Sequence, residues 1–263
     1  MSTARASRPT RRELLGEAPP PPRRGVRRGV YVLPALFTVG NVFCGYLSLD
    51  AAVNGRFEYA AMLIFLAAIL DAMDGRVARM TGATSAFGEQ LDSLADVVSF
   101  GVAPAFLVYR WGLVDFGRAG LLVSFLFVVC GACRLARFNV QIHIIDKRYF
   151  VGLPIPSAAG ALCGLIWALS GTAPAPEVKA GFLAVTAILS WLMVSTFRYR
   201  SFKDVDLKSR RSALLVPLFA LVVAAIAWRP DVALASLLSL YAVSAPVVRL
   251  FGLFRGRPKE TAA

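Results

Sequence analysis

Eight apolar runs, each close to the length of a membrane-spanning helix, restrict the possible folds of this chain more than any other feature. A helix needs about 17 to 25 mostly apolar residues to cross a bilayer, and backbone groups in lipid must be paired within helices or closed barrels. We therefore predict an all-α, polytopic transmembrane bundle of about eight spans. The runs cover residues 31–53, 59–75, 90–109, 117–136, 155–171, 178–197, 212–228 and 231–251.

Basic residues are distributed unevenly between the two sides of such a bundle. The chain has 29 Lys and Arg against 16 Asp and Glu, a net charge of +13. With the N-terminal segment inside, 24 of the 29 basic residues fall on the inner side and five in the outer loops. By the positive-inside rule this predicts a cell (inner) membrane protein with both termini cytoplasmic. Six spans with two mispredicted hairpins would keep the same parity.

The two ends of the chain differ in composition from the apolar runs. Residues 1–29 contain eight arginines and four consecutive prolines, which predicts a disordered basic cytoplasmic tail. We do not expect this tail to be a cleaved signal peptide, because the run after it has full membrane length. We expect one membrane domain over residues 30–252 and a short cytoplasmic tail over residues 253–263.

The cysteines and the single histidine offer weak alternatives for chemistry. Cys130 and Cys133 have the C-x-x-C spacing of redox or zinc sites, but the chain has no second pair and only one histidine, His143. We expect these cysteines, and also Cys44 and Cys163, to pack in or beside apolar runs. His143 stands among isoleucines in a cytoplasmic loop, and we interpret it as a structural or surface residue.

Four aspartates lie where a membrane protein least tolerates them, at or just inside the cytoplasmic ends of the second and third runs. A carboxylate toward the middle of a span costs about 2.5–3.5 kcal/mol on the insertion scale, so four together need a compensating partner. The two aspartates of each run are three or four residues apart and therefore share one face of a helix. Two such helices side by side would bring all four carboxylates together. Oxygen ligands of this kind suit Mg²⁺ or Mn²⁺. The residues are Asp71, Asp74, Asp92 and Asp96.

The residues between these aspartates fit a phosphate-binding site. Gly75 and Gly88 reduce the local bulk so that a nucleotide can approach the backbone, and Ala78 keeps the same face small. Arg79 supplies several donors for phosphate oxygens. Small residues also let membrane helices pack closely, and that alternative would be preferred if the aspartates were absent.

Written out, residues 71–96 have the pattern D-x₂-D-G-x₂-A-R-x₈-G-x₃-D-x₃-D. This pattern resembles in full the signature of the CDP-alcohol phosphotransferase (phosphatidyltransferase) family. The resemblance implies an integral membrane enzyme that transfers a phosphatidyl group from a CDP-activated lipid to an alcohol and releases CMP. It also implies a homodimer.

The resemblance further implies roles for individual residues. The first three aspartates, Asp71, Asp74 and Asp92, would hold one or two divalent ions against the pyrophosphate. Asp96 would deprotonate the acceptor hydroxyl and is also counted among the metal ligands. The nucleotide would be lined by Gly75, Ala78 and Gly88, and Arg79 would bind the pyrophosphate.

Further stretches resemble the membrane-embedded branch of this family that transfers the phosphatidyl group of CDP-diacylglycerol to L-serine. The similarity covers roughly residues 31–205, and one departure is Ala35, where members commonly carry Asn after the proline. Glycerol 3-phosphate or an inositol compound remains the alternative acceptor. The stretches are residues 33–45, 96–104, 133–139 and 152–156.

Serine carries a carboxylate that must be neutralised beside an anionic pyrophosphate. Arg134 and Arg137, with Asn139 as a polar neighbour, are the candidate acceptor contacts at the inner end of the fourth run. Arginines there also satisfy topology and bind anionic lipid headgroups. A second basic cluster is interpreted mainly as surface charge; it consists of Arg198, Arg200 and Lys203.

A cation transporter or channel is the alternative from another functional class, because intramembrane aspartates can also form an ion path. All four aspartates lie near one face of the membrane, and the small residues and Arg79 lie at offsets that an ion path does not require. The sequence therefore favours the transferase. No role is predicted for the last two apolar runs.

Overall fold

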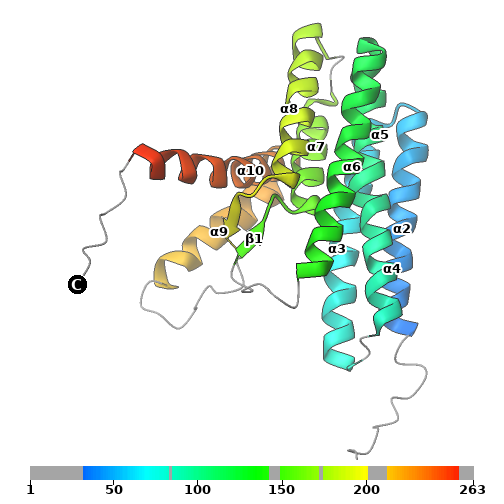
Figure 1. Cartoon of the computed structure of the whole chain (residues 1–263), viewed down its shortest axis with the longest axis vertical. Helices are drawn as coiled ribbons and strands as arrows, with labels where there is room; N and C mark the ends of the chain where they lie inside the picture. Colours follow the sequence, from blue (N-terminus) through cyan, green and yellow to red (C-terminus); the bar gives the residue numbers. More distant parts are fainter. Residues whose placement is uncertain (1–31, 83–84, 142–148, 172–173, 201–211, 255–263) are drawn as a thin grey trace, which may run out of the picture.

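The computed structural model describes residues 32–82, 85–141, 149–171, 174–200 and 212–254. Within them the chain forms eight helical rods and two short strands (Figure 1). The predicted N-terminal tail, residues 255–263 of the predicted C-terminal tail, and His143 lie outside the described residues. The helices are α2 (Val32–Val53), α3 (Phe57–Thr81), α4 (Ala86–Asp96), α5 (Ala103–Trp111), α6 (Arg118–Gln141), α7 (Ile155–Leu169), α8 (Pro176–Val194), α9 (Ser212–Trp228) and α10 (Pro230–Phe254).

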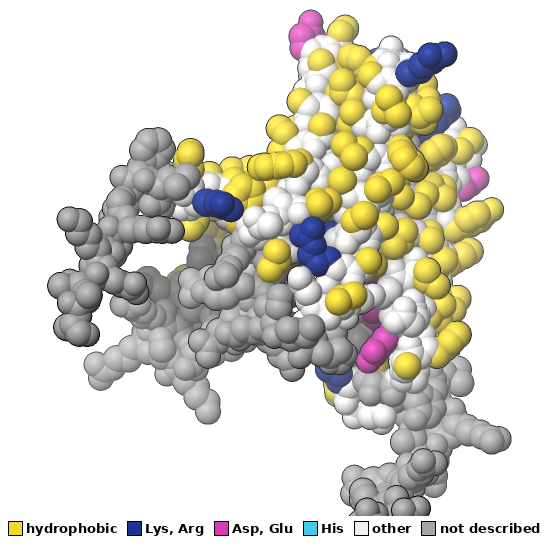
Figure 2. Space-filling view, viewed as in Figure 1, with side chains coloured by type: hydrophobic (Ala, Val, Ile, Leu, Met, Phe, Trp, Pro, Cys, Tyr) yellow, Lys and Arg dark blue, Asp and Glu magenta, His cyan; other side chains and the backbone are white. Residues whose placement is uncertain are grey.

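Each predicted apolar run coincides with one helical rod, so the all-α class is confirmed. The third rod joins α4 and α5 through a π-helical segment, Val97–Val102. Five of the described helices are long and apolar enough to cross a membrane. Apolar side chains cover the face of the bundle in Figure 2, and Leu122 and Phe125 of α6 are 65% and 61% exposed. This distribution is typical of a multi-pass membrane protein, whose outer side chains face lipid.

The helices that carry the aspartates extend beyond the apolar runs that predicted them. Helix α3 continues past residue 75 to Thr81, where Gly82 ends it in the left-handed conformation with φ 65°. Helix α4 begins at Ala86 instead of residue 90, because the Ser85 hydroxyl accepts a hydrogen bond of 3.0 Å from the Gly88 amide. Residues 75–81 after Asp74 therefore remain helical, and their side chains are arranged around the helix axis with its 3.6-residue period.

Close contacts fix α2 against α3 and against the rod formed by α4 and α5. The Ser48 hydroxyl of α2 donates to the carbonyl of Ala60 in α3 at 2.9 Å. A Cβ atom at Gly45 of α2 would lie 2.6 Å from Ser99 Oγ in the π-helical segment. Only glycine permits this approach, which matches the small-residue packing of membrane helices.

Two short strands, which the sequence did not predict, lie beside the start of α7 and the end of α8, and one of them contacts α10 (Figure 1). Strand β1 (Tyr149–Val151) pairs antiparallel with β2 (Arg198–Arg200), with Phe150 opposite Tyr199. Each strand has three residues, which is too short to produce a detectable alternation of apolar and polar positions.

Helices α9 and α10 depart from the direction of the other rods, and α10 runs crosswise beside α7 (Figure 1). Two glycines one turn apart on α7 allow the contact. A Cβ atom at Gly164 would lie 2.8 Å from the Cα atom of Ala235, and one at Gly160 would lie 2.5 Å from Leu238 Cδ1. The backbones of α7 and α10 therefore approach as closely as glycine allows.

Candidate active site

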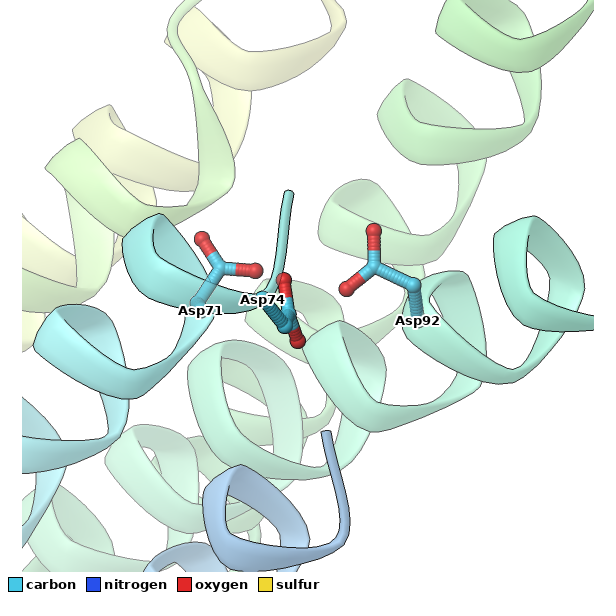
Figure 3. Close-up of side chains that lie close together, drawn as sticks. All are labelled: Asp71, Asp74 and Asp92. Atoms are coloured by element: carbon cyan, nitrogen blue, oxygen red, sulfur yellow. The ribbon is translucent and has the colours of Figure 1, made fainter. Parts of the chain in front are cut away.

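The carboxylates of Asp71, Asp74 and Asp92 converge between α3 and α4 (Figure 3). One oxygen from each lies within 4.8 Å of the others, and Asp74 is only 4% exposed. The first two residues share a face of α3, and Asp92 faces them from α4. The structure thus brings together three of the four predicted aspartates into a group that could hold a metal.

Asp96, one turn after Asp92, lies at the end of α4 beside the same group. Its carboxyl interacts with that of Asp71. Among the described residues, Oδ1 of Asp96 and Oδ1 of Asp92 are buried and accept no hydrogen bond. Buried carboxylate oxygens without donors, next to other carboxylates, fit the hard oxygen ligand set of Mg²⁺ or Mn²⁺.

Thr38 of α2 is a site residue that the sequence did not identify. Its hydroxyl donates a hydrogen bond of 2.9 Å to Oδ2 of Asp74, and its side chain is buried. A hydroxyl that donates to one carboxylate oxygen fixes the orientation of the other, as partners of metal ligands commonly do. The available signal was a polar residue within an apolar run, but sequence alone could not pair it with a residue on the next helix.

The π-helical segment directly after Asp96 anchors this aspartate to α2. The Ser99 hydroxyl donates to the backbone carbonyl of Asn41 at 2.9 Å, beside the close contact at Gly45. Single turns of π-helix in an α-helical rod frequently occur at functional sites. Here the segment sets where Asp96 stands relative to the carboxylates on α3.

The predicted nucleotide-contacting residues lie toward the connection between α3 and α4. The Arg79 side chain lies over Gly75, because a Cβ atom at Gly75 would be 3.6 Å from Arg79 Nη1. Ala78 is half-buried in the same part of α3. Gly88 lies one turn before Asp92 and uses its amide in the cap of α4. Gly75, Arg79 and Gly88 thus flank the aspartates on the side of this connection.

The three predicted acceptor contacts on α6 have different partners. Arg134 is 6% exposed, and its guanidinium interacts electrostatically with Asp96. Arg137 Nη1 instead donates to the carbonyl of Val194, the last residue of α8, at 2.9 Å. Asn139 Nδ2 donates to Ser93 Oγ of α4 at 2.9 Å. Of the three, Arg134 is the one with an electrostatic interaction with the aspartate cluster.

The remaining candidates are not brought into this site. Cys44 and Cys163 are buried free thiols, whereas Cys130 is half-buried and Cys133 is exposed. Among the described residues, the only group with metal-ligand geometry is the aspartate cluster. The side chains of Arg198 and Arg200, and all of Lys203, lie outside the described part of the chain.

Comparison with known proteins agrees with this geometry. A sequence profile described as CDP-alcohol phosphatidyltransferase matches residues 31–202. The chain is 40% identical over 228 residues to a CDP-diacylglycerol–serine O-phosphatidyltransferase of Helicobacter pylori, covering 84% of this chain and 92% of the relative. It is 36% identical to the enzyme of the same name from Bacillus subtilis, over 65% of this chain and 91% of the relative. An archaetidylserine synthase of Methanothermobacter thermautotrophicus is 41% identical over 64% of this chain and 69% of the relative.

Proposed function

The chain belongs to the CDP-alcohol phosphatidyltransferase family, and we propose that it is a phosphatidylserine synthase. It transfers the phosphatidyl group of CDP-diacylglycerol to the hydroxyl of L-serine and yields phosphatidylserine and CMP. The observation that carries this proposal is 40% identity, over 84% of the chain, to a relative whose name specifies both substrates. The buried guanidinium of Arg134, which interacts electrostatically with Asp96, supports an acceptor that carries a carboxylate.

The aspartate cluster is suited to this reaction. Asp71, Asp74 and Asp92, together with Asp96, would hold one or two divalent cations, Mg²⁺ or Mn²⁺. When bound, such ions neutralise charge on the pyrophosphate and help to orient it for displacement. Thr38 keeps Asp74 in a fixed orientation for this role.

Asp96 acts as the general base. It accepts the proton of the serine hydroxyl, while the serine oxygen attacks the phosphorus that carries the diacylglycerol ester. A new P–O bond forms, the P–O bond to CMP breaks, and CMP leaves with the electron pair. A positioned base of this kind typically contributes about 10²–10⁴-fold in rate.

Other side chains bind and orient the two substrates. Arg79 contacts the pyrophosphate, while Gly75, Ala78 and Gly88 leave room for the nucleotide. Arg134 binds the serine carboxylate. Arg137 and Asn139 hold the polar end of α6 against α8 and α4, so that Arg134 is kept at the site, and Asn139 adds a polar group near the acceptor.

The protein lies in the cell (inner) membrane with both termini and the active site on the cytoplasmic side. The rods from α2 to α8 form a six-helix catalytic core. Helices α9 and α10 add two more, which gives about eight spans in all. The uneven distribution of the 29 basic residues supports this orientation. A homodimer is the assembly expected from the family.

An acceptor assay on the purified protein tests the proposal. The enzyme is given CDP-diacylglycerol and Mg²⁺ or Mn²⁺, with serine, glycerol 3-phosphate or inositol phosphate in parallel reactions, and both CMP and the lipid product are measured. We expect CMP release to depend on serine and to match phosphatidylserine formation. Faster turnover with a phosphorylated acceptor would overturn the assignment of serine, and cation flux without CDP-lipid would revive the transporter alternative.

A further inference from the structure

A cavity of about 180 Å³ lies in the bundle between α3, the π-helical segment, α7 and α10. Its back wall is buried, since Ile64 is 1% exposed and Phe100 is fully buried. Phe65 and Leu238, which also line it, are half-buried. Among the described residues of its lining, only Ser157 has a polar side chain. The cavity is therefore an apolar space with a buried wall and a half-buried rim.

This cavity begins one helical turn from the aspartates. Ala68 and Ile64, three and seven residues before Asp71, share its face of α3. At 1.5 Å per residue they lie about 5 to 10 Å from Asp71 along the helix. On the neighbouring rod, Phe100 follows Asp96 by four residues. The cavity thus extends from the aspartate cluster into the apolar part of the bundle.

Leu238 of α10 closes the end of the cavity that is farther from the aspartates. A Cβ atom at Gly160 of α7 would lie 2.5 Å from Leu238 Cδ1 and 3.5 Å from Phe65 Cε1. The Phe65 ring also packs on Trp167, with centroids 5.8 Å apart. Helix α10 lies beyond the residues that match the family, which end at 202, so this wall of the cavity is supplied by an element outside the matched region.

Resting on the proposed function, we infer that the cavity receives the first carbons of one acyl chain of CDP-diacylglycerol, and that Leu238 sets how far the chain enters. The pyrophosphate of the donor binds at the aspartates, so its diacylglycerol part must continue toward apolar surroundings. The cavity supplies apolar surface directly beside that position, and burial of methylene groups there favours binding. At about 30 Å³ for each water-sized group, it has room for about six methylene groups.

The replacement of Leu238 by alanine tests this role, because it extends the cavity at its closed end. Two donors are compared, CDP-dihexanoylglycerol and CDP-didecanoylglycerol, whose chains have six and ten carbons. The ten-carbon chain can fill the added space and the six-carbon chain cannot. We expect the ratio of kcat/KM for the longer donor to that for the shorter donor to rise about tenfold over the wild-type ratio, as for two further buried methylene groups. This ratio does not depend on the fraction of enzyme that is folded.

Leu237→Ala is the matched control. Leu237 is the preceding residue of α10, but it lines a second cavity, of about 430 Å³, between α9 and α10. Its donor ratio should stay within about twofold of wild type. A ratio for Leu238→Ala within about threefold of wild type, or the same rise in both variants, would overturn the inference and leave the proposed function standing.

Photolabelling of the wild-type protein locates the chain without turnover. CDP-diacylglycerol that carries a diazirine at the sixth carbon of each acyl chain is irradiated with the protein, and adducts are mapped by mass spectrometry. We expect adducts on Phe65 or Leu238 that excess CDP-diacylglycerol removes and excess phosphatidylglycerol does not. Equal removal by both lipids would show a site for bulk lipid and overturn the inference. A protein labelled as expected that makes no phosphatidylserine would overturn the proposed acceptor alone.

Discussion

Asp96 ends α4 at the point where the rod becomes π-helical, and its carboxyl faces that of Asp71. A base for serine must lie beside the cations without being consumed as a ligand on both oxygens. Oδ1 of Asp96, like Oδ1 of Asp92, accepts no hydrogen bond from the described residues, so Asp96 has an oxygen that can accept a proton.

We expect Asp96→Asn to lower kcat by about 10³-fold, since an amide cannot accept the proton of the serine hydroxyl. The measurement is serine-dependent CMP release, with circular dichroism to verify that the helices remain. Asp50→Asn is the matched control, because Asp50 is an exposed aspartate of α2 that pairs with Arg56 at 3.3 Å. Turnover of Asp96→Asn within about tenfold of wild type would contradict the base assignment.

Thr38→Val should weaken metal binding while it preserves the shape of the site. Loss of the hydrogen bond to Asp74 is expected to raise the Mg²⁺ concentration for half-maximal activity by about tenfold. Thr186→Val is the control, since Thr186 is a buried threonine of α8 whose hydroxyl contacts only a backbone carbonyl one turn earlier. If the two variants need the same Mg²⁺ concentration, Thr38 is not a partner of a metal ligand.

For individual residues, the sequence predicts the aspartates of the motif over residues 71–96 but misses site residues that helix packing brings in from elsewhere in the chain. The aspartates follow from helical spacing, because residues three or four apart must share a face. Thr38 contacts the site across a helix interface, 36 residues from Asp74 in the chain. Which residues meet at such an interface depends on the rotation of each helix, which hydrophobicity alone does not fix.

The contact between Gly45 and Ser99 fixes the position of the α4–α5 rod against α2. We expect Gly45→Val to separate the two elements and destabilise the protein by about 1–3 kcal/mol, because the added atoms would overlap Ser99. Activity should fall in parallel, since Asp96 immediately precedes the displaced segment. The measurements are melting temperature and serine-dependent CMP release.

Gly181 supplies the control for this prediction. It is also a helical glycine, in α8, but a Cβ atom there would meet nothing within 4 Å. Gly181→Val should therefore leave both melting temperature and turnover close to wild type. Equal stability of the two variants would show that the contact at Gly45 does not maintain the rod.

Among the elements, the existence of the helices could be predicted and their ends could not. Apolar runs locate each rod, but α3 ends at Thr81 and α4 starts at Ala86 because the caps Gly82 and Ser85, not hydrophobicity, set these ends. The segment Val97–Val102 after Asp96 is apolar like the rest of its run, so hydrophobicity does not distinguish its π-helical form from an α-helix. Strands β1 and β2 depend on a partner about fifty residues away, as their pairing of Val151 with Arg198 shows.

The whole molecule places its chemistry at one end of a bundle whose sides are apolar. Helix α3 spans about 37 Å by its 25 residues and separates Asn54, at one end, from Thr81, near the aspartates. If the site faces the cytoplasm, these two exposed positions lie on opposite sides of the membrane. The positive-inside distribution predicts that Thr81 is on the inner side.

Cysteine labelling tests this orientation in a background in which the four native cysteines are replaced. In intact spheroplasts, a membrane-impermeant maleimide should react with Asn54→Cys and should spare Thr81→Cys. Permeabilisation should then make Thr81→Cys reactive. Reaction of Thr81→Cys before permeabilisation would place the site outside and contradict the topology.

In the proposed reaction, the serine hydroxyl displaces CMP at the aspartate cluster. Serine labelled with ¹⁸O in its hydroxyl tests it most directly, with purified protein, CDP-diacylglycerol and Mg²⁺ or Mn²⁺ and mass spectrometry of both products. We predict that phosphatidylserine carries the label in the bond between phosphorus and serine, that CMP is unlabelled, and that Asp96→Asn forms neither product at a comparable rate. CMP released without labelled phosphatidylserine would contradict the account.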